Sequence, residues 1–275
     1  MRKWNFFALE IEKEAEENRI AGIMQKPQKH LYHYFSSLES TNTLAVNMAE
    51  QGAEHGTIIH ADKQTGGRGR GGRRFESPAG GLYFSLILRP EFELADLPLI
   101  TLAAGTCLCL CIRDVVSVPV MMKWPNDLYL HERKLAGILT ESGPIRRGKA
   151  TFVVIGVGLN LLTTPEHFSP ELSRKSISLA AVSSGCPQAE ALLPLLVKAL
   201  LRASQQLGED KGALLAEWRR FDYLRGRQLR YVQHEKEIPA IGIGLAEDGQ
   251  YIILDCQGIE HRVTAGDLNP VRPVP

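Results

Sequence analysis

The chain has 275 residues, of which 44% are hydrophobic and 23% are charged, with 32 Lys and Arg against 31 Asp and Glu. These proportions are ordinary for a folded globular protein and exclude a disordered chain, which would be poor in apolar residues and highly charged. The net charge of +1 gives no overall case for binding a long nucleic acid or a membrane surface. At this length we expect one large domain with a smaller one beside it.

One segment departs from this balance, because residues 61–75 carry an excess of four positive charges. A concentrated positive loop in an otherwise neutral protein points to a local anionic ligand rather than to a long polyanion. The positive residues in it are Lys63, Arg68, Arg70, Arg73 and Arg74, and the single negative residue is Asp62.

The cysteines and the N-terminal segment carry no metal or targeting signal. None of the five cysteines belongs to a Cys-x-x-Cys pair and no His-x-x-x-His pattern accompanies them, so we expect buried, reduced thiols rather than a zinc site. Residues 1–24 lack the apolar core of a signal peptide, and no window approaches 18 apolar residues. We therefore expect a cytoplasmic protein without a membrane-spanning helix.

In chain order, the first half predicts an amphipathic helix over residues 6–24, a strand over 31–36 and a helix over 42–51. Ser40 or Thr41 can cap the second helix, and Gly52 stands where that helix ends. Strands are expected over residues 57–61 and 82–88. The glycine- and arginine-rich residues 65–81 between them are expected to form no regular structure.

The second half predicts helices over residues 97–116, 189–206 and 214–223, and strands over 120–124, 137–141 and 152–157. Helices mixed with hairpin-connected strands favour an α+β fold over a doubly wound parallel sheet. From residue 226 the pattern changes to short strands, which predicts a small β-barrel or sandwich over residues 228–232, 238–245, 251–255 and 261–263. We place a domain boundary near residues 224–226.

The first candidate site is the glycine- and arginine-rich run over residues 67–73, which contains the pattern G-x-G-x-x-G. A dinucleotide site needs a helix to begin at the last glycine, but Pro78 and the two glycines after it oppose a helix. We therefore expect a flexible loop whose arginines bind phosphate or carboxylate groups and close over them as a lid. A solvated Arg/Gly tether for RNA is the weaker alternative.

The second candidate is Lys123-Trp124-Pro125-Asn126-Asp127, where a strand ends at a turn that presents a cation, an amide and a carboxylate together. Asp127 can ligate Mg²⁺ or accept a proton from an incoming amine. On turn chemistry alone, an ordinary turn in which Asn and Asp bond their own backbone is the stronger interpretation.

Three shorter patterns complete the set: a lysine before a glycine-bearing strand, two glycines and an asparagine at a strand end, and a polar helix start. Glycine in a strand leaves room for a ligand against the backbone, although an edge lysine, a strand bulge and a helix cap explain each pattern by itself. The residues are Lys134 and Gly137, then Gly156, Gly158 and Asn160, and then Ser40, Thr41 and Asn42.

In this order, the patterns together resemble those of the biotin–protein ligases, over about residue 31 to the C-terminus. The matching runs are residues 40–42, 64–73, 123–127, 133–139 and 156–160. The resemblance implies an α+β fold, with a mixed-sheet catalytic domain of the biotin/lipoate ligase type over residues 31–224. It also implies an SH3-like barrel over residues 225–275, while residues 1–30 form an N-terminal helical extension.

The resemblance implies a ligase that forms a carbon–nitrogen bond in two steps. Biotin and MgATP first give biotinyl-5′-AMP and pyrophosphate, and a lysine of a biotin carboxyl carrier domain then attacks the mixed anhydride. The implied small molecules are biotin, ATP and Mg²⁺, the last held mainly through the ATP phosphates. A homodimer is compatible with the resemblance. Residues 1–30 are too few for the DNA-binding domain of longer relatives, so we expect no sequence-specific DNA binding.

The family pattern assigns a role to each matching position. The residues expected to bind biotin are Ser40, Thr41, Gln64, Gly67, Arg68, Arg70, Lys134, Gly137, Gly156 and Gly158. Those expected to bind ATP or the adenylate are Arg68, Arg70, Arg73, Phe75, Asn126, Lys134 and Asn160. The expected catalytic residues are Lys134, Arg70, Lys123 and Asp127, with Asp127 as the base for the carrier lysine. Phe75 stands where the family usually has Trp, so we expect stacking on adenine without an indole N–H.

Three other functions compete with this one. A lipoate or octanoate ligase or transferase shares the related fold, but the arginine loop and the Lys-Trp-Pro-Asn-Asp run favour biotin. An RNA-binding protein would use the Arg/Gly loop and bind RNA with salt-sensitive affinity, independently of ATP and biotin. A transcriptional regulator is disfavoured by the short N-terminal segment.

Overall fold

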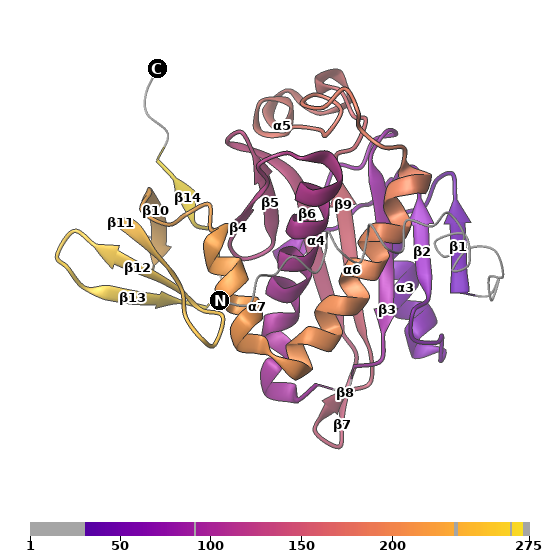
Figure 1. Cartoon of the computed structure of the whole chain (residues 1–275), viewed down its shortest axis with the longest axis horizontal. Coiled ribbons are helices and arrows are strands. Elements are labelled where there is room, and N and C mark those ends of the chain that lie inside the picture. Colours follow the sequence, from indigo (N-terminus) through magenta and orange to yellow (C-terminus); the bar gives the residue numbers. More distant parts are fainter. Residues whose placement is uncertain (1–30, 91, 234–235, 265, 272–275) are drawn as a thin grey trace.

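The computed structural model describes residues 31–90, 92–233, 236–264 and 266–271 (Figure 1). The helix predicted over residues 6–24 lies outside the described residues. A seven-stranded mixed sheet forms the centre of the larger domain, and only its first two strands pair in parallel. In spatial order the strands are β1 (Tyr32–Phe35), β2 (Ile58–Ala61), β3 (Leu82–Leu88), β9 (Val153–Leu159), β6 (Arg133–Ser142), β5 (Asp127–Leu130) and β4 (Met121–Lys123).

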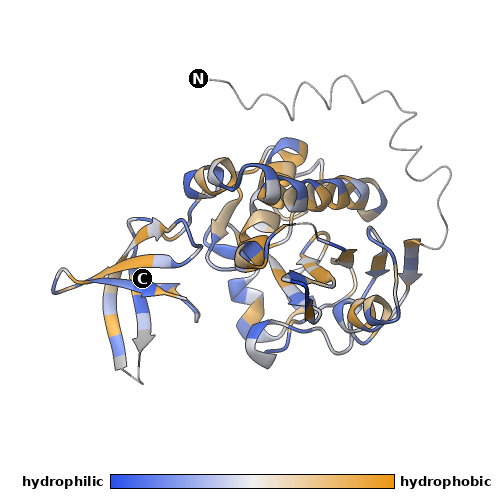
Figure 2. Cartoon of the chain, turned by 90° about the horizontal axis from the view of Figure 1, so that it is seen from below, coloured by the Kyte–Doolittle hydropathy of each residue, from blue (hydrophilic) through white to orange (hydrophobic). Residues whose placement is uncertain are grey.

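Helices cover the two faces of this sheet unequally (Figure 1). One face packs against α4 (Ile100–Val116), α6 (Ala189–Glu209) and α7 (Lys211–Arg220), and the other against α3 (Thr41–Glu50). Strand side chains alternate between the faces, so on β9 Ile155 and Val157 enter the larger core while Gly156 turns to the α3 side. Figure 2 shows apolar residues gathering toward the middle of the domain. The α+β prediction is confirmed.

One helical stretch, Leu94–Val116, is long and apolar enough to cross a membrane by length and composition alone. The expectation that no such window exists is therefore wrong. Most of this stretch is buried, because α4 lies in the core between the sheet, α6 and α7.

The cysteines differ in their surroundings. Burial raises the pKa of the three thiols on α4 to about 12 (Cys107, Cys109 and Cys111). Cys256 is exposed, contrary to the expectation of buried thiols.

A separate five-stranded antiparallel sheet forms the C-terminal barrel, which has the expected SH3-like character (Figure 1). Its strands are β10 (Gln228–Gln233), β11 (Lys236–Leu245), β12 (Tyr251–Asp255), β13 (Glu260–Val263) and β14 (Asn269–Pro270). The barrel joins the larger domain through aromatic contacts. The Trp124 indole N–H donates to the Gly249 carbonyl at 3.0 Å, and the Tyr251 ring lies against Trp124 and Trp218.

The sequence-based prediction missed several short elements: strands β5 and β14, the hairpin of β7 (Ile145–Arg146) and β8 (Lys149–Ala150), and helix α5 (Pro170–Lys175). Each is only two to six residues long, so no hydrophobic period can develop in it. The missed β5 is important, because it carries Asp127 at its first residue and pairs with β6 beside the site.

Candidate active site

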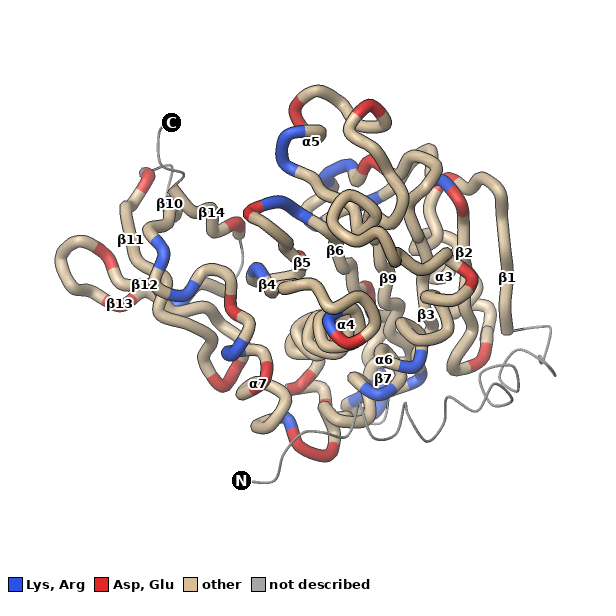
Figure 3. The backbone as a smooth tube through the Cα atoms, turned by 45° about the horizontal axis from the view of Figure 1, so that its top comes forward, with Lys and Arg blue, Asp and Glu red and all other residues tan. Residues whose placement is uncertain are grey.

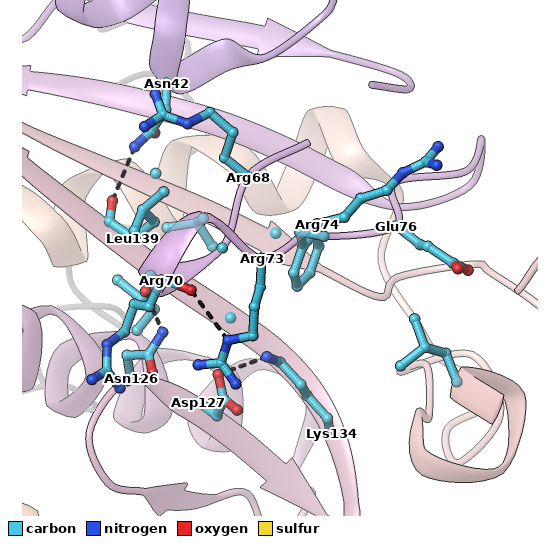
Figure 4. A pocket seen from close by; sticks show the side chains of 18 of the residues that line it. Asn42, Arg68, Arg70, Arg73, Arg74, Glu76, Asn126, Asp127, Lys134 and Leu139 are labelled. Carbon is cyan, nitrogen blue, oxygen red and sulfur yellow. Dashed lines mark hydrogen bonds and ion pairs between the residues drawn. The ribbon is translucent and has the colours of Figure 1, made fainter. Parts of the chain in front are cut away.

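A cavity of about 560 Å³ opens on the α3 side of the sheet, between the start of α3, the arginine-rich loop and the barrel (Figure 4). It brings together side chains that lie more than one hundred residues apart in the sequence. The predicted site residues that line it are Ser40, Thr41, Gln64, Arg68, Arg70, Arg73, Phe75, Lys123, Asn126, Asp127, Lys134, Gly137, Gly156 and Gly158.

Strand register builds the floor of the cavity. Across β5, β6 and β9, Asp127 is opposite Gly137, and Gly137 is opposite Gly158. In the adjacent row, Gly156 lies between Leu139 of β6 and Ser85 of β3. Because these glycines carry no side chain, side chains from other elements can lie directly against the floor of the cavity. The Phe75 ring does so over Gly137 and Gly158, and the Asn42 amide does so at Gly156.

A buried polar cluster forms one end of the cavity at the start of α3. The Thr41 backbone N–H and hydroxyl both donate to Gln64 Oε1, at 2.8 and 3.1 Å, and Gln64 Nε2 donates to Ser77 Oγ at 2.8 Å. The Ser40 hydroxyl accepts from the Thr43 N–H at 3.3 Å, as an N-cap does. The prediction that Ser40 caps the helix is therefore confirmed, and Ser40 also lines the cavity.

Asn42, which had no predicted role, lies at the centre of this cluster and is only 4% exposed. Its Oδ1 accepts from Ser85 Oγ at 2.6 Å, and its Nδ2 donates to the Leu139 carbonyl at 3.2 Å and to Glu141 Oε2 at 2.9 Å. A Cβ atom at Gly156 would collide with the Asn42 amide. Gly156 therefore makes room for Asn42, and it also lines the cavity, so its contact with biotin stays a prediction.

Cations gather at the other end of the cavity. Lys134 Nζ lies 2.7 Å from Asp127 Oδ1, and the Arg70 guanidinium donates to Asn126 Oδ1 at 3.2 Å. Burial lowers the pKa of Arg70, but an arginine so placed keeps its charge. An ammonium and a guanidinium side by side, each held by one partner, can stabilise negative charge that develops on a carboxylate or phosphate.

The barrel completes this cationic end. Arg73 forms an ion pair with Asp267, and Lys123 Nζ donates to Asn269 Oδ1 at 2.9 Å. Lys123 is only 8% exposed, and burial lowers its pKa. Burial alone would raise the pKa of Asp267, but the hydrogen bond and positive charge of Arg73 outweigh it and hold that pKa low. Figure 3 shows positive segments between the barrel, β4 and α5.

The expectation of no regular structure over residues 65–81 is confirmed, because the segment contains no strand and no helix beyond a three-residue 3-10 turn. Backbone hydrogen bonds nevertheless close the arginine loop on itself. The Phe75 N–H donates to the Gly67 carbonyl at 2.9 Å and the Gly69 N–H to the Arg73 carbonyl at 2.7 Å, around a 3-10 turn over Arg70–Gly72. A Cβ atom at Gly67 would collide with the Phe75 carbonyl. Gly67 therefore serves the crossing of the two loop strands and does not line the cavity.

The loop sends its arginines to opposite ends of the cavity (Figure 4). Arg68 reaches toward Asn42 and pairs with Glu141 Oε1 at 3.0 Å. Arg70 instead reaches toward Asn126, and Arg73 reaches toward Lys134. Arg74 points away from all of them. The loop arginines that were predicted to bind phosphate and carboxylate groups are thus divided between the polar end and the cationic end.

Two residues that were predicted to contact the nucleotide, Phe75 and Asn160, have surroundings that the sequence did not indicate. The Phe75 ring lies directly over Gly137 and Gly158, with Lys134 Nζ 5.4 Å from its centroid. Stacking of this ring on adenine stays a prediction. Asn160 is 3% exposed, does not line the cavity, and donates to the Lys134 carbonyl at 3.3 Å. Its observed contact holds the backbone of Lys134, and its contact with the nucleotide stays a prediction.

The sequence-based prediction missed several residues of the site. Glu141 lies four residues beyond Gly137 on the same strand, so the two-residue period of a strand could have placed it on the cavity face. The positions of Asp267 and Asn269 depend on how the barrel packs, and no local pattern reports that. Among the described residues, no group of three or more His, Cys, Asp or Glu is arranged to hold a metal ion.

Comparisons with known proteins identify the family to which the chain is similar. The model of the biotin/lipoate A/B protein ligase family matches residues 34–160. The chain is 38% identical over 148 residues to the bifunctional ligase/repressor BirA of Bacillus subtilis, a match that covers 54% of this chain and 45% of that relative. It is 31% identical over 235 residues to BirA of Escherichia coli, covering 84% of this chain and 71% of that protein.

A solved structure extends the likeness to nearly the whole fold. The biotin protein ligase from Aquifex aeolicus in complex with biotin and ATP superposes with a TM-score of 0.73 at 24% identity, covering 88% of this chain and 99% of that one. At this identity the likeness concerns the fold, and it includes the barrel. The chain belongs to the biotin/lipoate A/B protein ligase family.

Proposed function

We propose that the protein is an ATP-dependent biotin–protein ligase, which activates biotin as biotinyl-5′-AMP and transfers it to a lysine of a biotin carboxyl carrier domain. The observation that carries the proposal is the division of one cavity into a hydrogen-bonding polar end and a cationic end, in the fold of the biotin protein ligases. Biotin needs both surroundings at once, because its polar head requires hydrogen-bonding groups and its reacting carboxylate requires positive charge.

The cationic end suits the first step. A biotin carboxylate oxygen attacks the α-phosphorus of ATP, the bond from that phosphorus to the bridging oxygen breaks, and pyrophosphate leaves with the bond electrons. Lys134 and Arg70 neutralise charge on the two approaching anions, which would otherwise repel each other. Magnesium enters this proposal with the ATP phosphates, as part of the substrate.

The second step places a neutral lysine amine of the carrier against the acyl carbon of the adenylate. The new carbon–nitrogen bond forms as the carbon–oxygen bond to AMP breaks, and the amine loses a proton. Asp127, which is 2.7 Å from Lys134 Nζ, is the carboxylate best placed to take that proton. Within this proposal the protein acts in the cytoplasm, as a monomer or a homodimer.

The polar end distinguishes biotin from lipoate and octanoate. Thr41, Asn42 and Gln64 form a buried set of hydrogen-bonding groups, and a ligand without polar atoms at its head would leave them unpaired at a cost in free energy. An RNA-binding role is disfavoured, because Arg70 and Arg73 bond residues that line the cavity. Arg68 is also engaged within the protein, since it pairs with Glu141.

The proposal is tested by incubating the protein with MgATP, a purified biotin carboxyl carrier domain, and biotin, lipoate or octanoate in separate reactions. Mass spectrometry of the carrier should show the addition of one biotinyl group, and none when the acceptor lysine is replaced by arginine. Acylation by lipoate or octanoate in preference to biotin would assign the protein to the lipoate branch of the family instead.

A further inference from the structure

Glu141 on β6 connects Asn42 with Arg68 in one hydrogen-bonded network at the polar end of the cavity. Its Oε2 accepts from Asn42 Nδ2 at 2.9 Å, and its Oε1 pairs with Arg68 at 3.0 Å. The carboxylate is partly buried, with 25% of its side chain exposed, whereas Asn42 is almost fully buried. Glu141 itself does not line the cavity.

The partners of Asn42 determine which way its amide group points. The oxygen and nitrogen of an amide have nearly the same shape, so the direction depends on what each atom can bond. An ionised Glu141 and the Leu139 carbonyl can only accept, and together they take both N–H groups of Asn42. The Asn42 oxygen must then lie on the other side, against Ser85 and the bare backbone of Gly156.

This direction gives the polar end an excess of acceptors. Asn42 Oδ1 receives one hydrogen bond from Ser85, and its second lone pair stays available. The Thr41 hydroxyl gives its proton to Gln64 Oε1, and its oxygen lies 2.9 Å from Ser85 Oγ. Ser85 has a single proton to donate to Asn42 or to Thr41, so each of these two oxygens keeps at least one lone pair that can accept from a ligand. A head group that donates N–H bonds, such as a cyclic urea, satisfies these oxygens, whereas a dithiolane or an alkyl chain does not.

We infer that Glu141 is a positioning residue that fixes the Asn42 amide with its oxygen toward the acyl group, and so makes the enzyme select an acid whose head donates hydrogen bonds. This inference rests on the proposed function of the cavity. It assigns specificity to a residue that touches neither the acyl group nor the nucleotide.

The substitution Glu141→Gln tests the inference, because glutamine has the same shape but can donate to Asn42 and so permits the amide to turn. We expect the KM for biotin to rise about tenfold, the scale of one lost hydrogen bond to a buried group, while kcat and the KM for ATP stay within about twofold. The preference for biotin over octanoate, as a ratio of kcat/KM values, should fall by the same factor.

Glu247→Gln is the matched control, since Glu247 is an exposed carboxylate that pairs with Arg219 at 2.7 Å and does not line the cavity. It should leave all of these constants unchanged. Asn42→Ala removes the displayed oxygen itself and should reproduce the loss of preference. If Glu141→Gln leaves the preference for biotin over octanoate unchanged, the inference is overturned, whether or not Asn42→Ala lowers that preference.

A double-mutant cycle separates this effect from the charge of Arg68. Calorimetry should show that Glu141→Gln still weakens biotin binding in an Arg68→Met background. If it has no further effect there, pairing with Arg68 explains Glu141 and the inference is wrong. A wild-type protein without biotin-dependent activity would instead refute the proposed function, and thermal melting verifies that each variant is folded.

Discussion

Lys134 connects three parts of the site through its ammonium group and its backbone carbonyl. It pairs with Asp127 at 2.7 Å, lies over the Phe75 ring, and has its backbone carbonyl held by Asn160. Its side chain is 30% exposed, so it can reach an anion in the cavity without leaving the carboxylate that positions it. The residue is therefore suited to charge that appears during a reaction rather than to a permanent structural pair.

Lys134→Ala should reduce biotinyl-5′-AMP synthesis about 10²–10³-fold, because the charge that stabilises the transition state is lost. The measurement is single-turnover formation of the adenylate, followed by chromatography. Lys211→Ala is the control, since Lys211 pairs with Asp96 at 2.8 Å away from the cavity. Adenylate formation at a near-normal rate in Lys134→Ala would show that this lysine is not catalytic.

At the scale of elements, the arginine loop depends on close approach of its two halves. Gly67 permits the crossing beneath Phe75, and the 3-10 turn bends at Gly71 with φ of 61°. The geometry of the turn sends Arg68 to one end of the cavity and Arg70 to the other (Figure 4). The loop thus connects recognition of the acyl head to binding of the reacting groups.

Gly67→Ala should disturb this crossing and raise the KM for biotin and for ATP together, by about tenfold or more, because both arginines lose their places. Steady-state kinetics with each substrate varied in turn measures the effect. Gly71→Asn should cost much less, since asparagine tolerates a positive φ and a side chain there meets no atom within 4 Å. Equal effects of the two substitutions would refute the proposed role of the crossing.

At the scale of the whole molecule, the joint between the domains contains a buried carboxylate. Asp222 is 6% exposed, accepts from the Tyr251 hydroxyl at 2.7 Å, and accepts from the Leu224 N–H at 2.9 Å. Burial raises its pKa to about 6, above the ordinary value of 3.8, even though these hydrogen bonds oppose the shift. The folded protein therefore holds a proton that the unfolded chain releases.

Because the folded pKa is the higher one, the contribution of Asp222 to stability should fall as the pH rises from about 4 to about 6, and stay level above. Urea unfolding of the wild type and of Asp222→Asn over this range measures it. The wild type should lose about 1–3 kcal/mol relative to the variant. Parallel pH dependence in the two proteins would exclude Asp222 as the titrating group.

Local patterns predicted most of the larger domain and many of the side chains of the site. The helix cap at Ser40, the glycines of β6 and β9, and the arginine loop are each visible in a few adjacent residues. Contacts made by packing were not predictable: Asp267 reaches Arg73 across the domain joint, and Asn160 turns behind Lys134. Phe75 shows the same limit, because its sequence neighbours do not indicate the two glycines beneath it.

If this cavity joins biotin to AMP, the protein must catalyse a biotin-dependent isotope exchange between ATP and pyrophosphate. With MgATP and labelled pyrophosphate, label should enter ATP only when biotin is added, and far more slowly with lipoate or octanoate. Lys134→Ala should abolish most of that exchange. Exchange supported by lipoate or octanoate but not by biotin, or no exchange with any of the three acids, would contradict the account.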